Sequence, residues 1–461
     1  MATNTKVIAD HNPPAVTKIL AEFIVNHPTF DNGGWDAKVQ HEGERTFFNW
    51  LGCAVGASHH EAPTAALAAA QILQPAPQAT LLGRSTRVDI ANAALINGIS
   101  SHTFDFDDTH LKTVIHPAGP VASALLPLAE LKNLGGAAVI DALIIGIDVA
   151  CRVGNCMYPT HYDKGWHITG STGMLGAAAA CARLLKLDVQ QTMMALGIAA
   201  SQPVGLREQF GTMSKPLHPG AAARTGLMAA LMAQQGFTAS PRALEAPRGL
   251  IQVAAPAFNW NEITDELGKR FEISFNTYKP FACGIVSQPS MDACVQLKAM
   301  GVKAEDIERL DLKVHSLVLE LMGKKTPTIG LEGKFSVYHC CAVALIFGQA
   351  GEPEYSDDVV NRPDVLALRA KVNVVVTDGI EEAGADVTAV LKDGRQIHVV
   401  IEHAIGSLER PMSDKDLEAK FHSQADDVLG ATKAQTLMDM AWHMTSIANV
   451  NELTKLAVGE I

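Results

Sequence analysis

The spacing of apolar residues changes twice along this chain, and this change constrains the fold more than any other feature. Up to about residue 300, apolar residues recur every three or four positions, as at Val139, Leu143 and Ile144, which is the spacing of an amphipathic helix. Strand-like patterns follow. From Asp414 helical spacing returns, with Ser413 as the expected N-cap.

Three short segments carry the strand patterns. Residues 310–314 alternate apolar and polar, 372–376 are rich in valine, and 387–401 read as a hairpin around an Asp-Gly turn. We therefore expect a mainly α protein: a large all-helical domain built from 1–279 and 406–461, and a smaller α+β lid domain inserted at 280–405. A cleft between two such domains is a common place for a ligand.

Composition excludes several classes of protein. The chain has 461 residues, 48% of them hydrophobic and 19% charged, which is typical of packed domains and not of disorder. Its 37 basic and 49 acidic side chains give a net charge of −12, and no run of Lys and Arg could follow a phosphate backbone, so nucleic acid is not an expected partner. An anionic substrate could bind only where a few cations converge.

Neither a membrane nor an oxidising compartment is indicated. The most apolar run, 137–150, contains Asp141 and Asp148, and residues 1–12 include no continuous apolar segment, so we expect no membrane span, no signal peptide and a cytoplasmic location. None of the eight cysteines has C-x-x-C spacing. We expect them to be reduced, buried thiols.

Titratable residues are concentrated between positions 101 and 116. Asp105 and His116 are the strongest candidates for a site, because one acid can orient a histidine and His116 precedes a helix expected to begin at Pro120 or Val121. The neighbouring residues His102, Asp107, Asp108 and His110 are as well explained by solvated or structural roles. The spacing matches neither H-E-x-x-H nor a Cys/His finger, so no metal is expected.

Two further segments combine glycine with a candidate side chain. His167 precedes a Gly, Ser and Thr stretch that opens an Ala-rich helix; the glycines follow no strand, so a dinucleotide fingerprint is not indicated. Lys215 precedes Pro216 in a segment that also includes His218. A lysine followed by proline suits a fixed loop that presents an ammonium group to a carboxylate.

Lys279 and Tyr338 complete the candidates. Lys279 also precedes a proline, at the expected entry to the second domain. Tyr338 is as compatible with a core position as with a catalytic one. Neither residue indicates a function when it is taken alone.

Taken together and in this order, the segments resemble the MmgE/PrpD family, which includes 2-methylcitrate dehydratase, cis-aconitate decarboxylase and iminodisuccinate epimerase. The resemblance covers about residues 15–445 and is strongest at 105–109, 116–117, 165–167 and 211–218. It implies a helical domain with an α+β lid, a homodimer, and a metal-free pocket between the domains. It places the following residues in that pocket: Asp105, Thr109, His116, His167, Lys215, Lys279 and Tyr338.

One departure from the family pattern concerns decarboxylation. The decarboxylase branch has a histidine five residues after the lysine of the second Lys-Pro motif, where this chain has Gly284, and another histidine position is occupied here by Gln288. A glycine cannot transfer a proton, so the resemblance favours other chemistry over decarboxylation.

The sequence thus predicts a cofactor-independent enzyme that removes a proton α to a carboxylate of a small di- or tricarboxylate, most simply a hydro-lyase. In this hypothesis Lys215 and Lys279 bind carboxylates, and His116 and His167 act as base and acid in either order. Asp105 fixes a histidine tautomer. Thr109, Tyr338 and His218 bind the substrate. An epimerase of an iminodisuccinate-like compound and a non-catalytic polycarboxylate-binding protein are the alternatives.

Overall fold

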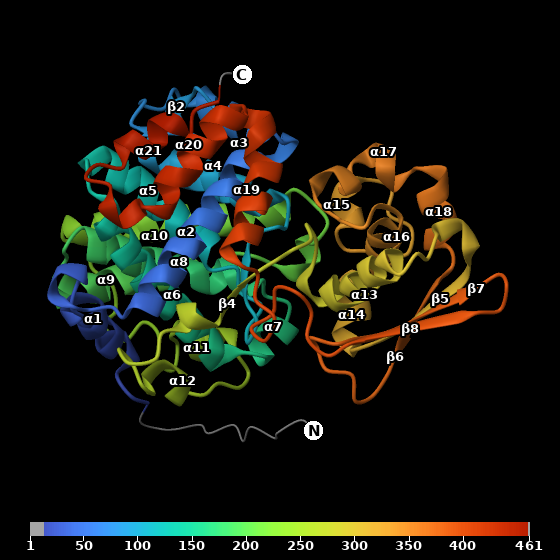
Figure 1. Ribbon diagram of the computed structural model, residues 1–461. Coiled ribbons are helices and arrows are strands. Elements are labelled where there is room, and N and C mark those ends of the chain that lie inside the picture. The colour runs from blue at the N-terminus through green and yellow to red at the C-terminus, as the bar shows by residue number, and fades with distance from the viewer. Residues whose placement is uncertain (1–12, 460–461) are drawn as a thin grey trace.

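Residues 13–459 are described by a computed structural model in which the chain forms two lobes (Figure 1). The larger lobe is helical and carries both ends of the described chain. Its helices are α1 (Val16–Asn26), α2 (Ala37–Gly56), α3 (Glu61–Ile72), α4 (Ile90–Thr103), α5 (Ala118–Lys132), α6 (Gly136–Met157), α7 (Thr160–Asp163), α8 (Ile168–Leu184), α9 (Val189–Ala200), α10 (Ser214–Gln234), α11 (Leu250–Ala254), α12 (Asn261–Thr264), α19 (Asp414–Leu429), α20 (Ala431–Trp442) and α21 (Asn451–Leu456).

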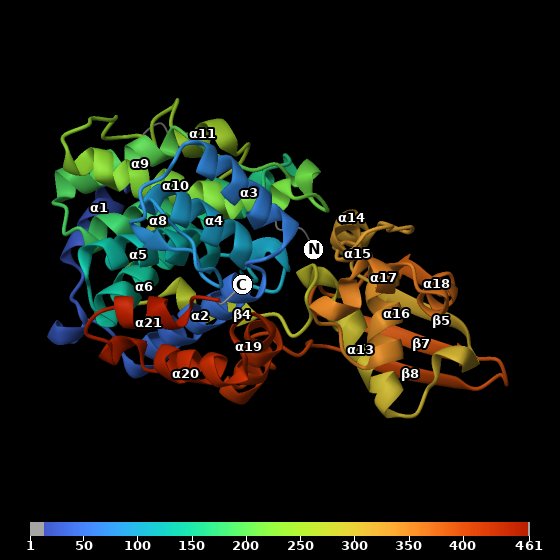
Figure 2. The same cartoon turned by 90° about the horizontal axis from the view of Figure 1, so that it is seen from above.

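The core of the larger lobe joins residues from both ends of the sequence. Leu20, Phe47 and Leu143 lie in the same buried cluster as Phe421 and Leu437. Helices α19 and α20 pack against α2 (Figure 2). The C-terminal helices therefore complete the core that the first helices begin.

Small residues allow the central helices to approach closely. A Cβ atom at Gly146 of α6 would lie 2.7 Å from the carbonyl oxygen of Gly176 of α8, and a Cβ atom at Gly176 would lie 2.6 Å from that of Gly146. Larger side chains would separate these backbones. Alanines of α8 fill the adjoining layers and are fully buried.

Two pairs of short strands interrupt the helices of the larger lobe. Strand β1 (Ala79–Thr80) pairs with β2 (Arg87–Val88), and β3 (Asp108–His110) pairs antiparallel with β4 (Asn276–Tyr278). The second pair brings the segment after Asp105 next to the segment before Lys279, although more than 150 residues separate them in the sequence.

The smaller lobe is built on a four-stranded sheet with the strand order β6-β5-β7-β8. Strands β5 and β6 are parallel, with Leu310 opposite Val372, and the other pairs are antiparallel. Helices α13 and α16 pack with the sheet. The elements are α13 (Gln288–Ala299), β5 (Ile307–Val314), α14 (Ser316–Met322), α15 (Gly330–Gly333), α16 (Val337–Phe347), α17 (Asp357–Val360), α18 (Pro363–Arg369), β6 (Val372–Val376), β7 (Ala385–Leu391) and β8 (Gln396–Ile401).

The predicted fold class, mainly α with a smaller α+β part, is confirmed. The predicted strands and hairpin correspond to β5, β6, β7 and β8, and Ser413 caps α19 through a capping box with Asp416. A second buried cluster extends from Phe281 to Ala404 and includes Phe106 of the larger lobe. The exact domain limits at 280 and 405 stay a prediction.

Two details differ from the sequence predictions. Helix α5 begins at Ala118 and not at Pro120 or Val121. Lys215 lies in the first turn of α10 and not in a loop. Pro216 is compatible with this first turn because no intrahelical partner awaits its missing N–H, and α10 continues through Pro219 as well.

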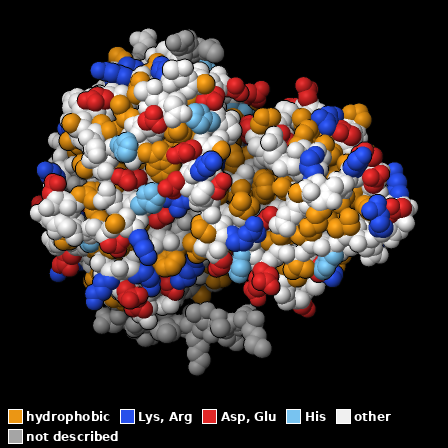
Figure 3. All heavy atoms as spheres, in the orientation of Figure 1, with side chains coloured by type: hydrophobic (Ala, Val, Ile, Leu, Met, Phe, Trp, Pro, Cys, Tyr) orange, Lys and Arg blue, Asp and Glu red, His pale blue; other side chains and the backbone are white. Residues whose placement is uncertain are grey.

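The surface carries acidic and basic side chains in a mixed arrangement on the face shown in Figure 3. No helix among residues 13–459 is both long and apolar enough to cross a lipid bilayer. All eight cysteines are buried free thiols, as predicted.

Candidate active site

A small cavity of about 40 Å³ lies between the two lobes and brings the main candidate residues together. The larger lobe contributes polar and charged side chains, whereas the smaller lobe contributes an apolar wall. The lining residues are Asp105, Val114, His116, Tyr162, His167, Phe210, Lys215, Lys279, Gly284, Ile285, Val286, Leu321, Met322 and Phe335.

Asp105 lies between the two candidate lysines. It follows the end of α4 with φ 51°, a left-handed conformation that is uncommon for a residue other than glycine. One carboxylate oxygen is 3.0 Å from Nζ of Lys215, and the other is 2.5 Å from Nζ of Lys279. Burial would raise the pKa of Asp105, but the two ammonium groups outweigh it and lower the pKa well below 3.8.

This contact corrects the role expected of Asp105. Its carboxylate makes no hydrogen bond to a histidine among residues 13–459; it pairs with the lysines instead. The two lysines respond differently: burial lowers the pKa of Lys215, whereas the charges of Asp105 and Asp107 overcome burial and raise the pKa of Lys279. Both ammonium groups face a site that could accept carboxylates.

His116 has one ring nitrogen fixed and one available. Its Nδ1 lies 2.7 Å from the carbonyl oxygen of Asp108, which can only accept, so Nδ1 carries the proton and Nε2 has the lone pair. Oγ1 of Thr109 lies 3.2 Å from the same Nδ1. Burial, together with Lys279 and His102, lowers the pKa of His116 well below 6.5. At neutral pH this imidazole can accept a proton.

The acid that contacts the histidines of this site is Asp107, which the sequence explains as well by a solvated or structural role. Its carboxylate lies 2.6 Å from Nδ1 of His102 and 3.6 Å from Nδ1 of His116. Burial would raise the pKa of Asp107, but the two histidines lower it strongly. His102 is also buried, and its Nε2 has no hydrogen-bond partner among the described residues. Only the proximity of Asp107 to His102 in the sequence could have signalled this pair.

His167 and His218 form a second pair. Their Nδ1 atoms lie 2.8 Å apart, so one ring donates a hydrogen bond to the other. His167 occupies the N-cap position of α8, and His218 lies on α10. Burial lowers the pKa of both rings, to about 4 for His218. The tautomer of His218 therefore determines whether Nε2 of His167 donates or accepts in the cavity.

Three of the predicted substrate-binding residues do not line this cavity. Thr109 is fully buried and bonds to His116, and His218 contacts the cavity residue His167. Tyr338 belongs to the core of the smaller lobe. Phe335 lines the cavity three residues earlier, and its ring lies 5.0 Å from Nζ of Lys215, at a distance suited to a cation–π contact.

Gly284 and Gln288, the two positions that depart from the family pattern, both lie in apolar or backbone surroundings. Gly284 lines the cavity, and a Cβ atom there would lie 2.3 Å from Sδ of Met322. Gln288 is buried and donates to the carbonyl oxygen of Phe281 at 3.2 Å. Met322 therefore occupies the space beside Gly284, and the wall is apolar there.

Two groups of side chains could in principle bind a cation. One consists of His102, His116 and His167, and the other of His102, Asp105 and Asp107; within each, ligand atoms lie within 4.8 Å of one another. Asp105 is already paired with two ammonium groups, whose charge opposes a metal cation nearby. The expectation that no metal takes part stays a prediction.

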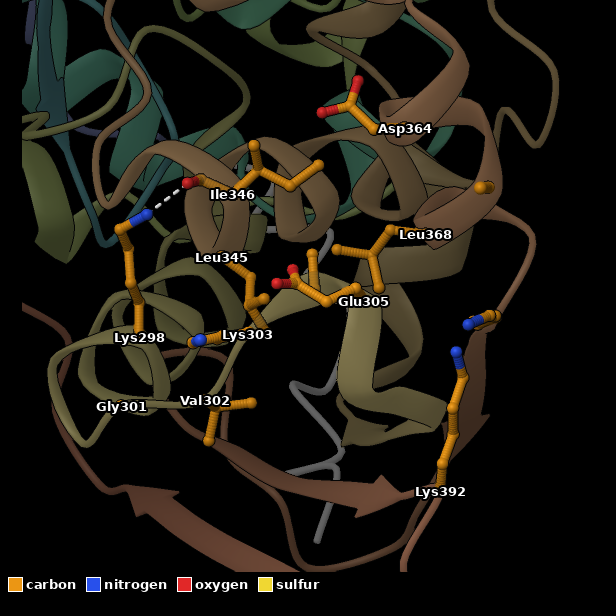
Figure 4. Close-up of a pocket in the computed structure, with 13 residues that line it drawn as sticks. Lys298, Gly301, Val302, Lys303, Glu305, Leu345, Ile346, Asp364, Leu368 and Lys392 are labelled. Carbon is orange, nitrogen blue, oxygen red and sulfur yellow. Dashed lines mark hydrogen bonds between the residues drawn. The ribbon is translucent and has the colours of Figure 1, made fainter.

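A larger cavity of about 620 Å³ lies in the smaller lobe, away from these residues (Figure 4). Lys298 points along its rim and donates to the carbonyl oxygen of Ile346, and Glu305 and Asp364 also line it. It contains no histidine and no buried acid–lysine pair. The cavity between the lobes is therefore the better candidate for catalysis.

Comparison with known proteins shows the family to which the chain belongs. The MmgE/PrpD N-terminal domain model matches residues 18–263, and the MmgE/PrpD C-terminal domain model matches residues 281–445. The chain belongs to the MmgE/PrpD family. The C-terminal model extends beyond the smaller lobe into α19 and α20, which pack with α2.

The similar proteins include a decarboxylase-like protein, a decarboxylase and a dehydratase. The cis-aconitate decarboxylase-like protein oryM of Aspergillus oryzae is 24% identical over 92% of this chain and 94% of its own length. Human cis-aconitate decarboxylase is 26% identical over 80% of this chain and 79% of its length. The 2-methylcitrate dehydratase of Escherichia coli K12 is 24% identical over 85% and 86%. The prediction of a lyase-type enzyme of this family is in agreement with these relatives.

Proposed function

We propose that this protein is a hydro-lyase that removes water from a small hydroxylated di- or tricarboxylate. The observation that carries the proposal is the meeting of two ammonium groups and a neutral imidazole in one buried cavity between the lobes. Lysine ammonium groups bind carboxylates and stabilise the negative charge that develops when the neighbouring carbon loses a proton. The 2-methylcitrate dehydratase relatives support this reaction type.

His116 is the proposed base. Its Nδ1–H is bonded to the carbonyl oxygen of Asp108, so Nε2 can take the proton from the carbon next to a carboxylate. The electron pair of the broken C–H bond forms the double bond, the C–O bond breaks, and the hydroxyl group leaves as water with the proton that His116 has taken up. His167 is proposed to donate a hydrogen bond from Nε2 to the leaving hydroxyl group, provided that His218 donates to Nδ1 of His167 and so leaves a proton on its Nε2.

Asp105 sets the resting state of the two lysines. Its carboxylate forms an ion pair with each ammonium group, and Nζ of Lys279 also donates to the carbonyl oxygen of Asp105 at 3.1 Å. The N–H groups that these contacts leave free can bind substrate carboxylates. The cavity is smaller than a typical ligand site. Substrate binding therefore requires the cavity walls to move, and the apolar wall from the smaller lobe is the part that can withdraw.

Decarboxylation of an unsaturated tricarboxylate is the second candidate, because several relatives are cis-aconitate decarboxylases. It needs a proton donor at the carbon that loses CO₂. The cavity presents Gly284 and Met322 on the wall where the decarboxylase branch is expected to have a histidine, so dehydration is the better supported reaction.

The test is incubation of the purified protein with a panel of hydroxylated and unsaturated di- and tricarboxylates in deuterated buffer, followed by NMR. Loss of a hydroxyl group with formation of an alkene supports the proposal. Release of CO₂ would establish decarboxylation, and deuterium exchange without an alkene would establish epimerisation. Calorimetric binding without turnover of any compound would leave a binding protein and refute the proposal.

The remaining properties are also proposals. We propose that catalysis requires neither a metal nor another cofactor, that the protein acts as a homodimer, and that it is located in the cytoplasm. The family resemblance supports the first two, and the eight buried free thiols suit a reducing compartment such as the cytoplasm. Activity that survives dialysis against a chelator would support catalysis without a metal. Sedimentation analysis tests the homodimer, and fractionation of cells tests the location.

A further inference from the structure

Three consecutive backbone carbonyl groups around Asp105 each accept a hydrogen bond from a different lysine. The carbonyl oxygen of Phe104 lies 2.8 Å from Nζ of Lys334, and that of Asp105 lies 3.1 Å from Nζ of Lys279. The carbonyl oxygen of Phe106 lies 2.5 Å from Nζ of Lys420. Lys279 belongs to the proposed site, but Lys334 and Lys420 do not line the cavity.

The two outer lysines also bind the segment that carries Lys279. Nζ of Lys420 donates to the carbonyl oxygen of Lys279 at 2.9 Å, and Nζ of Lys334 donates to that of Ala282 at 2.9 Å. Each lysine therefore bridges the Asp105 segment and the Lys279 segment, one on each side of Asp105. Both side chains are almost completely buried.

The two bridges come from different parts of the molecule. Lys420 lies on α19 of the larger lobe, and its ammonium group is 4.1 Å from the ring centre of Phe106. Lys334 belongs to the smaller lobe, where Glu352 balances its charge at 2.5 Å. The contact of Lys334 with Phe104 therefore joins the lobes directly beside Asp105. Hydrogen bonds offset the cost of burying an ammonium group: Lys334 donates to two carbonyl groups of the site segments and to Glu352, and Lys420 donates to two such carbonyl groups.

We propose that Lys334 and Lys420 are positioning residues for the reaction. They fix the left-handed backbone at Asp105 and its distance from Lys279, and so direct the Asp105 carboxylate between the two ammonium groups that bind the substrate. This inference rests on the proposed function for its kinetic part only. Neither lysine touches the substrate, so each acts through Asp105 and Lys279.

The test compares Lys334→Met and Lys420→Met with Lys298→Met. Lys298 is the matched control, because it also donates to a backbone carbonyl, that of Ile346, but lies at the distant cavity of the smaller lobe (Figure 4). We expect kcat to fall about 10- to 100-fold in the two site variants, because small displacements of catalytic groups have effects of this size, and KM to change much less. The control keeps kcat within about twofold, as expected for a surface contact away from the site. Folded Lys334→Met and Lys420→Met variants with wild-type kcat would overturn the proposal.

Glutamine variants cover the case in which a methionine variant does not fold. Lys334→Gln and Lys420→Gln keep an N–H donor on a shorter side chain that cannot bridge both segments, so the same selective loss of kcat is expected, and wild-type kcat in both would overturn the proposal. Hydrogen exchange read by mass spectrometry gives a measurement without substrate. We expect faster exchange in peptides covering 104–110 in the site variants and no change there in Lys298→Met.

This exchange measurement separates the two levels of inference. If the wild-type protein converts no polycarboxylate, the proposed function fails, while faster exchange at 104–110 still supports the positioning role. If exchange at 104–110 is unchanged in both site variants, the positioning role fails whatever reaction the protein catalyses.

Discussion

Replacing Asp105 with asparagine removes the carboxylate that lies between two buried ammonium groups. Nζ of Lys215 and of Lys279 are 3.0 and 2.5 Å from its oxygens, and all three side chains are almost completely buried. Removing one partner of a buried ion pair typically costs about 3–5 kcal/mol, because the remaining charge is left without compensation. We therefore expect Asp105→Asn to lower the free energy of unfolding by about that amount at pH 7.

The pH of the measurement follows from the pKa of Asp105, which folding lowers well below 3.8. A lowered carboxyl pKa stabilises the folded state above the unfolded pKa, and this stabilisation is lost as pH falls from there through the folded pKa. At pH 7 it is fully present. An unfolding entropy of about 2.1 cal/mol/K per residue, taken over 461 residues, converts the expected loss into roughly 3–5 °C in Tm.

The assay is differential scanning calorimetry of Asp105→Asn beside Glu22→Gln. Glu22 forms an exposed ion pair with Lys18 at 3.6 Å, and such pairs contribute about 0–1 kcal/mol, so the control should leave Tm within about 1 °C. A folded Asp105→Asn variant with the Tm of the wild type would refute the reasoning. It would mean that the Asp105 carboxylate does not offset the free-energy cost of burying the two ammonium groups.

Three further predictions concern the cavity. His116→Asn should lower kcat by about 10²-fold or more, since general base catalysis contributes about that factor, whereas the exposed His403→Asn should not; equal rates in both would exclude His116 as the base. Because burial lowers the pKa of His116 and His167 well below 6.5, both are neutral at pH 7, and His116 loses the lone pair on Nε2 only as pH falls through its lowered pKa. The profile of kcat/KM should therefore stay flat from pH 7 down through 6.5, and an acid limb centred at or above 6.5 would contradict the assignment. Gly284→Ala places a Cβ atom 2.3 Å from Sδ of Met322 and should cost about 1–3 kcal/mol through overpacking; calorimetry should show a smaller cost of Gly284→Ala in a Met322→Ala background than in the wild type, and an equal cost in both would count against this packing.

The helical and strand segments could be predicted where the apolar spacing is regular and a local signal marks the end. The alternating segment 310–314 lies within β5, and Ser413 caps α19. The prediction of a loop at Lys215 is wrong, because Pro216 is also compatible with the first turn of a helix, here α10. The start of α5 was misplaced for a similar reason, since Pro120 can also lie inside a first turn.

The sequence predicts which residues form the site, but it does not predict all the contacts between them. The sequence identified Asp105, His116 and both cavity lysines, which the structure brings to one cavity. It did not predict that Asp107 instead of Asp105 would contact histidine, because neighbouring acids differ only in the direction in which the backbone turns them. The left-handed φ of Asp105 determines that direction.

Lys334 and Lys420 could not be predicted from local sequence at all. Their contacts with Phe104 and Phe106 join residues 230 and 314 positions apart. Tyr338, which the family resemblance places in the pocket, lies in the core of the smaller lobe and does not line this cavity. Long-range contacts of this kind depend on how the two lobes meet, which the spacing of residues does not encode.

A crystal structure with tricarballylate bound would test the central claim most directly. This tricarboxylate has no hydroxyl group to eliminate, so it should remain intact in the cavity. We predict one carboxylate on Nζ of Lys215 or Lys279 and a carbon next to a carboxylate facing Nε2 of His116. Tricarballylate bound only at the lysine-lined cavity of the smaller lobe, with the cavity between the lobes unoccupied by it, would contradict the account.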